Sequence, residues 1–549
     1  MTNSEFFQDS PVLKNQFTQD PLLSRYLKKR LPDGMAQEIF PHLKELGDLA
    51  AGPMLAWADE AERNPPVHVP YDPWGRRIDE IRVAGGWKKM EELAAKHGLI
   101  AAGYERKYSE FSRLYQMSML YLYHSSSAIF SCPLAMTDGA ARAVELYGDA
   151  AMKSRAFRHL TSRDPAQFWT SGQWMTEKSG GSDVSGTSTV AKREASGGYS
   201  LWGVKWFTSA TTSQMAMTLA RPEGAEAGSR GLSLFYLELR NPQGQLQNIR
   251  IHRLKDKLGT KALPTAELSL EGTPAQVVGG EGQGVRKISS LFNITRIYNA
   301  ICSISQMRRG IELAVEYSKI RTAFGRKLSE HPLHVQTLSD LQLEWMGCFQ
   351  LVMKAVELLG KEECGKASET ESALLRVLTP LAKLYCGKAV VSVSSEVLEC
   401  FGGAGYVEDT GLPKLLRDAQ VLAIWEGTTN VLSLDMLRAF EKEKSFEAIQ
   451  KDLITRLKGL RNPEAQKILT EALNHLGFEF ESALKAGPEA LSGNARGFAM
   501  TLTRIYIGSL LSEFADQTGD TKDSLAARHW LLHRNLRCDL KAIQQSLID

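Results

Sequence analysis

One glutamate stands in a short segment whose composition suits a buried base. Glu426 lies between Trp425 and Gly427, ahead of Thr428-Thr429-Asn430. A carboxylate between an aromatic ring and a glycine, in a loop before a helix, can be desolvated and can then act as a general base. The alternative is that its charge only complements the positive end of the following helix, which requires no substrate.

A glycine-rich segment extends from Gln173 to Val184. Its paired glycines, Gly180-Gly181, precede Ser182 and Asp183. Glycines let backbone amides and a neighbouring hydroxyl approach a polar ring edge or a phosphate closely. Taken alone, the segment could equally be only a tight turn.

Two further segments contain side chains that suit a flat or phosphorylated cofactor. In Lys205-Trp206-Phe207-Thr208, the Trp could cover one face of a flavin and the Thr could bond its edge, although a core aromatic is the simpler explanation. In Arg321-Thr322-Ala323-Phe324-Gly325-Arg326, the first Arg could clamp a pyrophosphate, although an Arg at a helix end is often only solvated.

The elements that must position these residues are expected in four segments. Residues 1–165 are predicted to be helical, with a Pro-rich connector from Asn64 to Trp74, and residues 166–283 to form a compact β domain. Residues 284–440 are predicted to form a helical bundle, and residues 441–549 a helical extension. Strands separated from helices indicate an α+β fold, and because no GxGxxG follows a predicted strand, a Rossmann site is disfavoured.

Composition, helix caps and helix-breaking residues also predict where the individual strands and helices begin and end. The β-prone runs are 200–208, 215–220, 232–239 and 265–270. A long buried helix is expected after Gly284, and a second from about 333 to 359. A third should open with a capping box from Ser368 to Glu371, bend at Pro380 and end at Gly402-Gly403.

Composition excludes several classes of protein. The 66 basic and 63 acidic residues give a formal charge of +3, too little to attract nucleic acid or anionic lipid. Seven scattered cysteines without a CxxC pair suggest neither a metal site nor a disulfide framework. The first thirty residues contain Glu5, Asp9 and Asp20 and no Arg before Arg25, and no apolar run approaches roughly 20 residues, so we expect a cytoplasmic soluble protein.

Taken in order, these segments resemble the acyl-CoA dehydrogenase family over roughly residues 100–440. The AidB-like branch is the most similar, through MTEKSGGSDV, HRLKDKLG, NITRI, FGGAGY and IWEGTTNVLSLD, the connector from Asn64 to Ile78 and the extra C-terminal segment. The resemblance implies an N-terminal helical domain, a middle β-barrel or sandwich domain, and a C-terminal helical bundle with an extension.

The resemblance also implies roles for residues. It implies that Glu426 is the catalytic base; some members supply this base just before the Arg of the long helix, but Ile294-Thr295-Arg296 offers no carboxylate there. It implies contacts to an acyl-CoA thioester from Ser182, Arg296 and Gly427. The implied FAD contacts, some of them to the FAD of a neighbouring subunit, are Met175, Thr176, Ser182, Trp206, Thr208, Arg321, Phe324, Gly402, Gly403, Thr428 and Asn430.

The implied reaction is removal of the α-proton by Glu426 and hydride transfer from the β-carbon to flavin N5, which gives a trans-2-enoyl thioester. Hydrogen bonds to the thioester oxygen would stabilise the enolate, and one such donor is typically worth about 3 kcal/mol. The family also implies an electron-transfer flavoprotein as acceptor and a homo-oligomer built as a dimer of dimers.

Two other functions stay open. One is a protein that sequesters acyl-CoA with little turnover. The other, from the AidB-like resemblance, is DNA protection through a basic C-terminal region. Residues 441–549 contain 15 basic and 15 acidic residues, which disfavours DNA binding. A basic stripe is expected only on the last helix, where a solvated face or a subunit contact would explain it equally well; it comprises Arg528, His529, His533, Arg534, Arg537 and Lys541.

Overall fold

The computed structural model describes residues 8–195 and 197–541. Its contacts divide the chain into two compact units. We call Leu49–Tyr108 with Tyr115–Tyr298 the β unit, and Met1–Asp48, Ser109–Leu114 and Asn299–Asp549 the helical unit. The chain passes between the units between Tyr108 and Ser109 and within three helices, α2 (Met35–Ala51), α6 (Ser112–His124) and α10 (Gly284–Ile320).

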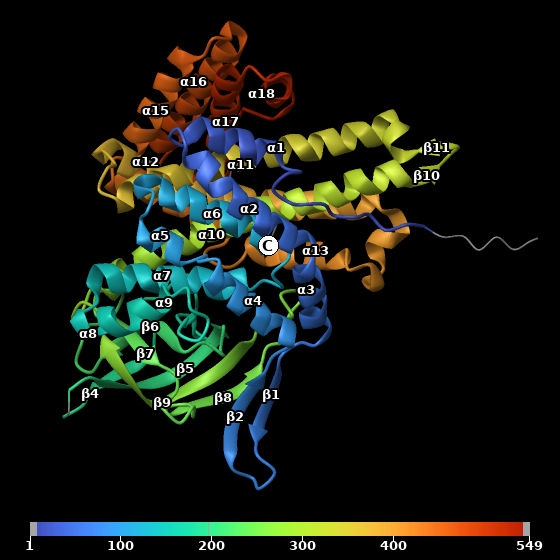
Figure 1. Cartoon of the computed structure of the whole chain (residues 1–549). Helices are drawn as coiled ribbons and strands as arrows, with labels where there is room; N and C mark the ends of the chain where they lie inside the picture. Colours follow the sequence, from blue (N-terminus) through green and yellow to red (C-terminus); the bar gives the residue numbers. More distant parts are fainter. Residues whose placement is uncertain (1–7, 196, 542–549) are drawn as a thin grey trace, which may run out of the picture. The chain divides into compact units, whose positions relative to one another are not determined.

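The β unit contains a seven-stranded sheet that closes on itself (Figure 1). Strands β6, β4, β5, β9 and β7 pair in that order, and β7 pairs back to β6; β3 lies parallel to β6, and β8 pairs with β9. Closure leaves few free edges for aggregation. The predicted β domain is confirmed. The strands are β3 (Ser171–Gln173), β4 (Val190–Arg193), β5 (Tyr199–Ser209), β6 (Met215–Pro222), β7 (Ser233–Glu238), β8 (Ile249–Leu254) and β9 (Thr265–Val277).

The segment predicted as a Pro-rich connector is instead a β-hairpin, so that prediction was wrong. Strands β1 (Val67–Tyr71) and β2 (Arg77–Arg82) pair antiparallel, and Figure 1 shows the hairpin extending beyond the larger sheet. The buried Asp79 carboxylate fastens it, since it accepts the Ile251 amide at 3.2 Å and lies 2.8 Å from His68 Nε2. A two-stranded hairpin tolerates prolines because half of its backbone amides need no strand partner.

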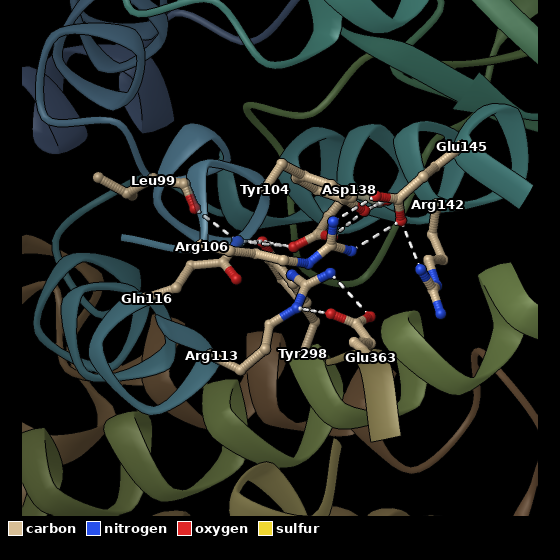
Figure 2. Close-up of polar contacts among 10 residues, drawn as sticks. All are labelled: Leu99, Tyr104, Arg106, Arg113, Gln116, Asp138, Arg142, Glu145, Tyr298 and Glu363. Atoms are coloured by element: carbon tan, nitrogen blue, oxygen red, sulfur yellow. Dashed lines mark hydrogen bonds and ion pairs between the residues drawn. The ribbon is translucent and has the colours of Figure 1, made fainter. Parts of the chain in front are cut away.

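A buried polar network joins helices of the β unit (Figure 2). The Asp138 carboxylate accepts hydrogen bonds from Tyr104 at 2.8 Å, Gln116 at 2.7 Å and Tyr298 at 2.8 Å. These residues come from α7, α5, α6 and α10, so one carboxylate fixes four helices. Besides its parts of α2, α6 and α10, the unit contains the α-helices α3 (Pro53–Arg63), α4 (Gly85–Lys96), α5 (Ala101–Glu105), α7 (Ser131–Tyr147), α8 (Ala150–Met152) and α9 (Arg158–Leu160).

The helical unit contains most of the predicted bundle and extension. The capping box at its third predicted helix is confirmed, because the Glu371 amide donates to the Ser368 hydroxyl at 3.2 Å and the Ser368 amide donates to the Glu371 carboxylate at 2.9 Å. Pro380 lies within that helix. The helices are α1 (Pro21–Arg30), α11 (Pro332–Glu363), α12 (Glu369–Cys400), α13 (Pro413–Leu422), α14 (Thr429–Lys442), α15 (Ser445–Gly459), α16 (Pro463–Ala486), α17 (Pro488–Thr518) and α18 (Thr521–His533).

The basic stripe expected on the last helix is not formed. Helix α18 ends at His533, so Arg537 and Lys541 lie outside it. Arg534 follows the helix and pairs with Glu344 at 3.0 Å. The prediction was wrong because it extended a helical period past the end of the helix, and the DNA-binding alternative loses its only local support. None of the described helices combines the length and the apolar character needed to cross a membrane.

Candidate active site

In the β unit, the glycine-rich segment lies along strand β5. The Trp206 amide donates to the carbonyl of Thr176 at 2.9 Å, and the Trp174 amide donates to Met217 on β6. Two of the segments selected from the sequence are therefore in direct contact. Ser182 is exposed at the tip of the loop. A Cβ at Gly181 would lie 2.9 Å from the Thr176 hydroxyl, so a side chain there would require Thr176 or the loop to shift.

A buried ion pair holds this segment in place. The Glu177 carboxylate accepts from Lys205 Nζ at 2.8 Å, from Ser188 Oγ at 2.6 Å and from Thr189 Oγ1 at 2.5 Å. Burial raises the pKa of Glu177, but Lys205 and the hydroxyl donors outweigh it and bring the pKa to about 2. Burial lowers the pKa of Lys205, and Glu177 opposes that shift.

The roles of Glu177 and Lys205 were not predicted. Both residues lie within segments that the sequence singled out, yet neither was assigned a contact. The available signal was Lys205 itself, a lysine between Val204 and Trp206 in a β-prone run, since a buried ammonium group requires a charged or polar partner.

Strand β5 is irregular at the predicted flavin-binding residues. Its register with β9 shifts between Lys205 and Thr208, which is typical of a β-bulge and changes the direction of the side chains. Trp206 is half-buried, whereas Thr208 is buried and donates its hydroxyl to the Ala266 carbonyl at 2.8 Å. The ammonium group of Lys255 lies 3.4 Å from the centre of the Trp206 ring, a cation–π contact that the sequence did not predict.

In the helical unit, the loop with the candidate base joins α13 to α14. Glu426 adopts a left-handed backbone at φ +59°, and Gly427 follows at φ +108°. A left-handed conformation is uncommon for a residue with a side chain and often marks a functional site. Thr428 is the N-cap of α14, yet its hydroxyl makes no capping bond, and Asn430 is exposed in the first turn.

A buried lysine on α12 anchors this loop. Lys383 Nζ donates to the Gly427 carbonyl at 2.5 Å, and the Lys383 side chain is fully buried. A buried ammonium group needs hydrogen-bond acceptors, and the one at Gly427 holds the backbone directly after Glu426. Sequence reasoning missed Lys383, although a lysine within the apolar run from Leu381 to Cys386 was the signal for it.

The ends of α10 and α12 bring two more predicted segments together. The rings of Tyr317, one turn before Arg321, and Phe401, directly before Gly402, lie 4.7 Å apart. Gly402 has φ +58°, and the space above it and above Gly403 is open, because an added Cβ would meet nothing within 4 Å. A ligand could therefore approach this backbone closely.

Phe324 lies at the tip of a small hairpin formed by β10 (Thr322–Ala323) and β11 (Arg326–Lys327). Phe324 and Gly325 both have positive φ, at +50° and +81°, as a two-residue hairpin turn requires. The Phe324 side chain is 95% exposed, which is unusual for a large apolar group. Arg321 precedes the hairpin and donates to the Gln8 side chain at 3.2 Å.

Each unit, taken by itself, offers residues that fit a part of FAD. The half-buried Trp206 ring offers a flat surface, and the open backbone at Gly402-Gly403 offers close approach. Among the described residues, the buried indole nitrogen of Trp425 has no hydrogen-bond partner. The predicted substrate contact Arg296 is half-buried on α10, in the part of that helix that belongs to the β unit.

Comparison with known proteins identifies the family. Four family models match: the AidB N-terminal domain at residues 9–164, the acyl-CoA dehydrogenase middle domain at 172–273, the acyl-CoA dehydrogenase C-terminal domain at 282–440 and the acyl-CoA dehydrogenase 11 C-terminal domain-like model at 439–547.

Individual relatives agree with these matches. Acyl-CoA dehydrogenase family member 11 of Caenorhabditis elegans is 43% identical over 94% of this chain and 87% of its own length. AidB of Escherichia coli (strain K12) is 30% identical over 73% of each chain. The crystal structure of C. elegans ACDH-11 in complex with C11-CoA superposes with a TM-score of 0.95 at 41% identity, over 98% of this chain and 94% of that one. The protein belongs to the acyl-CoA dehydrogenase family, whose members are FAD-dependent oxidoreductases that act on CH–CH bonds.

Proposed function

We propose that this chain dehydrogenates an acyl-CoA thioester between its α- and β-carbons, with Glu426 as the base. The observation that supports the proposal is the loop after α13, where a carboxylate stands at φ +59° and the next carbonyl is held by Lys383 at 2.5 Å. A left-handed residue of this kind costs on the order of 1–3 kcal/mol, so a fold retains it where its geometry is useful.

The chemistry follows from the weak acidity of the substrate. The α-hydrogen of a thioester is too weakly acidic for a carboxylate in water, so the site must exclude water and stabilise the enolate. In the proposal, Glu426 takes the α-proton onto its carboxylate, and its backbone N–H donates to the thioester oxygen. One such donor contributes about 3 kcal/mol to the transition state. Lys383 keeps both groups of Glu426 in position by fixing the following peptide.

FAD, when bound, supplies the acceptor for the hydride that leaves the β-carbon. Trp206 offers a ring surface for its isoalloxazine, and the open backbone of Gly402 and Gly403 allows a phosphate or ribose of a neighbouring subunit's FAD to come close. The full set of proposed FAD contacts is Met175, Thr176, Ser182, Trp206, Thr208, Arg321, Phe324, Gly402, Gly403, Thr428 and Asn430.

The proposed substrate is an acyl-CoA, supported by the C11-CoA complex of the C. elegans relative. Its proposed contacts are Ser182, Arg296 and Gly427. We also propose a homotetramer, because the apolar side chain of Phe324 is 95% exposed and a neighbouring subunit with its FAD would cover it. An electron-transfer flavoprotein as acceptor, a cytoplasmic location and a role in fatty-acid metabolism complete the proposal.

The proposal is tested by anaerobic titration of the purified flavoprotein with saturated acyl-CoAs from short to long chain. At least one of them should bleach the flavin absorption and yield the corresponding 2-enoyl-CoA. If several acyl-CoAs bind, as measured by calorimetry, while none bleaches the flavin, the sequestering function is correct and dehydrogenation is not.

A further inference from the structure

The helical extension and the end of α14 form a cavity of about 530 Å³ that is open to solvent, and none of the residues that line it belongs to the proposed active site. Helices α14, α15, α16 and α17, all within the helical unit, supply its walls, and Figure 1 shows α15, α16 and α17 grouped together in orange to red. The volume lies within the range of about 300–1,000 Å³ that is typical of small-molecule sites.

Aromatic side chains form the wall of this cavity. The rings of Phe446 and Phe480 stack with centroids 5.6 Å apart, and Phe440 lies 5.3 Å from Phe446. Phe498 lies 5.3 Å from Phe480 and completes the group. An open pocket with this lining leaves apolar surface in contact with water, and a hydrocarbon ligand would bury that surface.

Gly477 keeps part of the space open. It lies inside α16 and lines the cavity, and an added Cβ would meet nothing within 4 Å. Glycine is the weakest helix former after proline, so a larger residue would favour the helix itself. The neighbouring Phe478 also lines the cavity, yet 67% of its surface is exposed, which leaves apolar surface uncovered at the opening.

The lining also includes polar groups. Lys458 is exposed in the last turn of α15, and among residues 8–195 and 197–541 no carboxylate forms an ion pair with it. Gln450, Gln466 and Asn474 add side-chain amides, and Glu481 is the one acidic residue of the lining. A site with apolar walls and a cation with amides among its lining residues suits a chain that ends in a carboxylate.

We propose that this cavity binds a long-chain fatty acid as the free carboxylate. The hydrocarbon chain would lie among the four phenylalanines, and the carboxylate would lie beside Lys458. The site is separate from the proposed dehydrogenase chemistry and does not depend on it.

The test uses the full-length flavoprotein, calorimetric titration with hexadecanoate, and a pair of variants at one position. Gly477→Trp should fill the cavity and weaken hexadecanoate binding at least tenfold, whereas the matched control Gly477→Ala should bind as the wild type does. Flavin reduction by acyl-CoA, measured in parallel, should be the same in all three proteins. Equal hexadecanoate affinity in Gly477→Trp and Gly477→Ala would overturn the proposal.

A second variant tests the polar end without changing the packing of the wall. Lys458→Gln should weaken hexadecanoate binding about tenfold and leave binding of hexadecanol unchanged. An equal loss for acid and alcohol would contradict a carboxylate contact.

Light scattering distinguishes a subunit contact from a ligand site. If wild-type protein binds no hexadecanoate and Gly477→Trp changes the oligomeric mass, the apolar opening is an interface between copies of the chain, and the proposal fails.

Discussion

The ammonium group of Lys205 lies 2.8 Å from the carboxylate of Glu177, and both side chains are buried. This contact joins strand β5, which contains Trp206, to the loop that precedes Ser182. The pair therefore couples the stability of the β unit to the geometry of two predicted FAD-binding segments.

We expect Lys205→Met to destabilise the protein by about 3–5 kcal/mol, because it leaves a buried carboxylate without its cation. Urea unfolding followed by far-UV circular dichroism measures this free energy. The double variant Lys205→Met/Glu177→Gln should recover part of the loss, since it removes the unpaired charge. A double variant no more stable than Lys205→Met would contradict a charge-based explanation.

Because of the Lys205–Glu177 pair, we expect the free energy of unfolding to fall at acidic pH. The pKa of Glu177 is about 2 in the folded protein and ordinarily about 4.5, so its stabilising contribution is complete above pH 4.5 and is lost as pH falls towards 2. The shift corresponds to roughly 3 kcal/mol. Unfolding free energies measured from pH 6 down to pH 3 should therefore fall less steeply in Glu177→Gln than in the wild type.

At Glu91 we expect the opposite pH dependence, in which the protein loses stability as the pH rises. The pKa of Glu91 is raised to about 7, mainly because the side chain is buried. A hydrogen bond from Gln214 opposes this rise, and the nearby Glu92 adds to it. Because the folded state favours the protonated form, stability is highest below pH 4.5 and declines as pH rises to 7, by up to roughly 3 kcal/mol. Melting temperatures between pH 5 and pH 8 should decline more in the wild type than in Glu91→Gln, and parallel curves would refute this.

Replacing the proposed base should separate binding from chemistry. Glu426→Gln keeps the size of the side chain but cannot accept the proton, so we expect FAD and acyl-CoA to bind while flavin reduction slows by about 10²–10⁴-fold or more. Stopped-flow absorbance under anaerobic conditions measures the rate. Retention of the wild-type rate would remove Glu426 as the base.

Lys383 is proposed to position that base. We expect Lys383→Met to slow flavin reduction at least tenfold, because the Gly427 carbonyl loses its donor and the Glu426 peptide is free to turn. The matched control is Lys388→Met, at a half-buried lysine on the same helix. A positioning role predicts that Lys383→Met also changes the pH profile of reduction, whereas a general loss of stability would lower the amount of folded protein and leave that profile unchanged.

Local features of the chain were predictable from its sequence. The capping box of Ser368 and Glu371, the β-prone runs around Trp206 and the loop of Glu426 each depend on residues close together in the chain, where helix caps, side-chain period and turn chemistry apply. The same limits explain the errors. A helical period does not show where α18 ends, and the prolines near β1 concealed a hairpin that Asp79 fastens to a distant strand.

Only the tertiary structure decided which distant residues meet. Lys383 and Gly427 are 44 positions apart and Lys205 and Glu177 are 28 positions apart, and no spacing rule pairs them. The cavity beside Gly477 likewise arises from four helices that leave a space together. The sequence by itself determined the residue types that can do chemistry and the elements that contain them. Packing determined their partners and the free space, because a buried charged or polar group needs a partner, and that partner can come from any part of the chain.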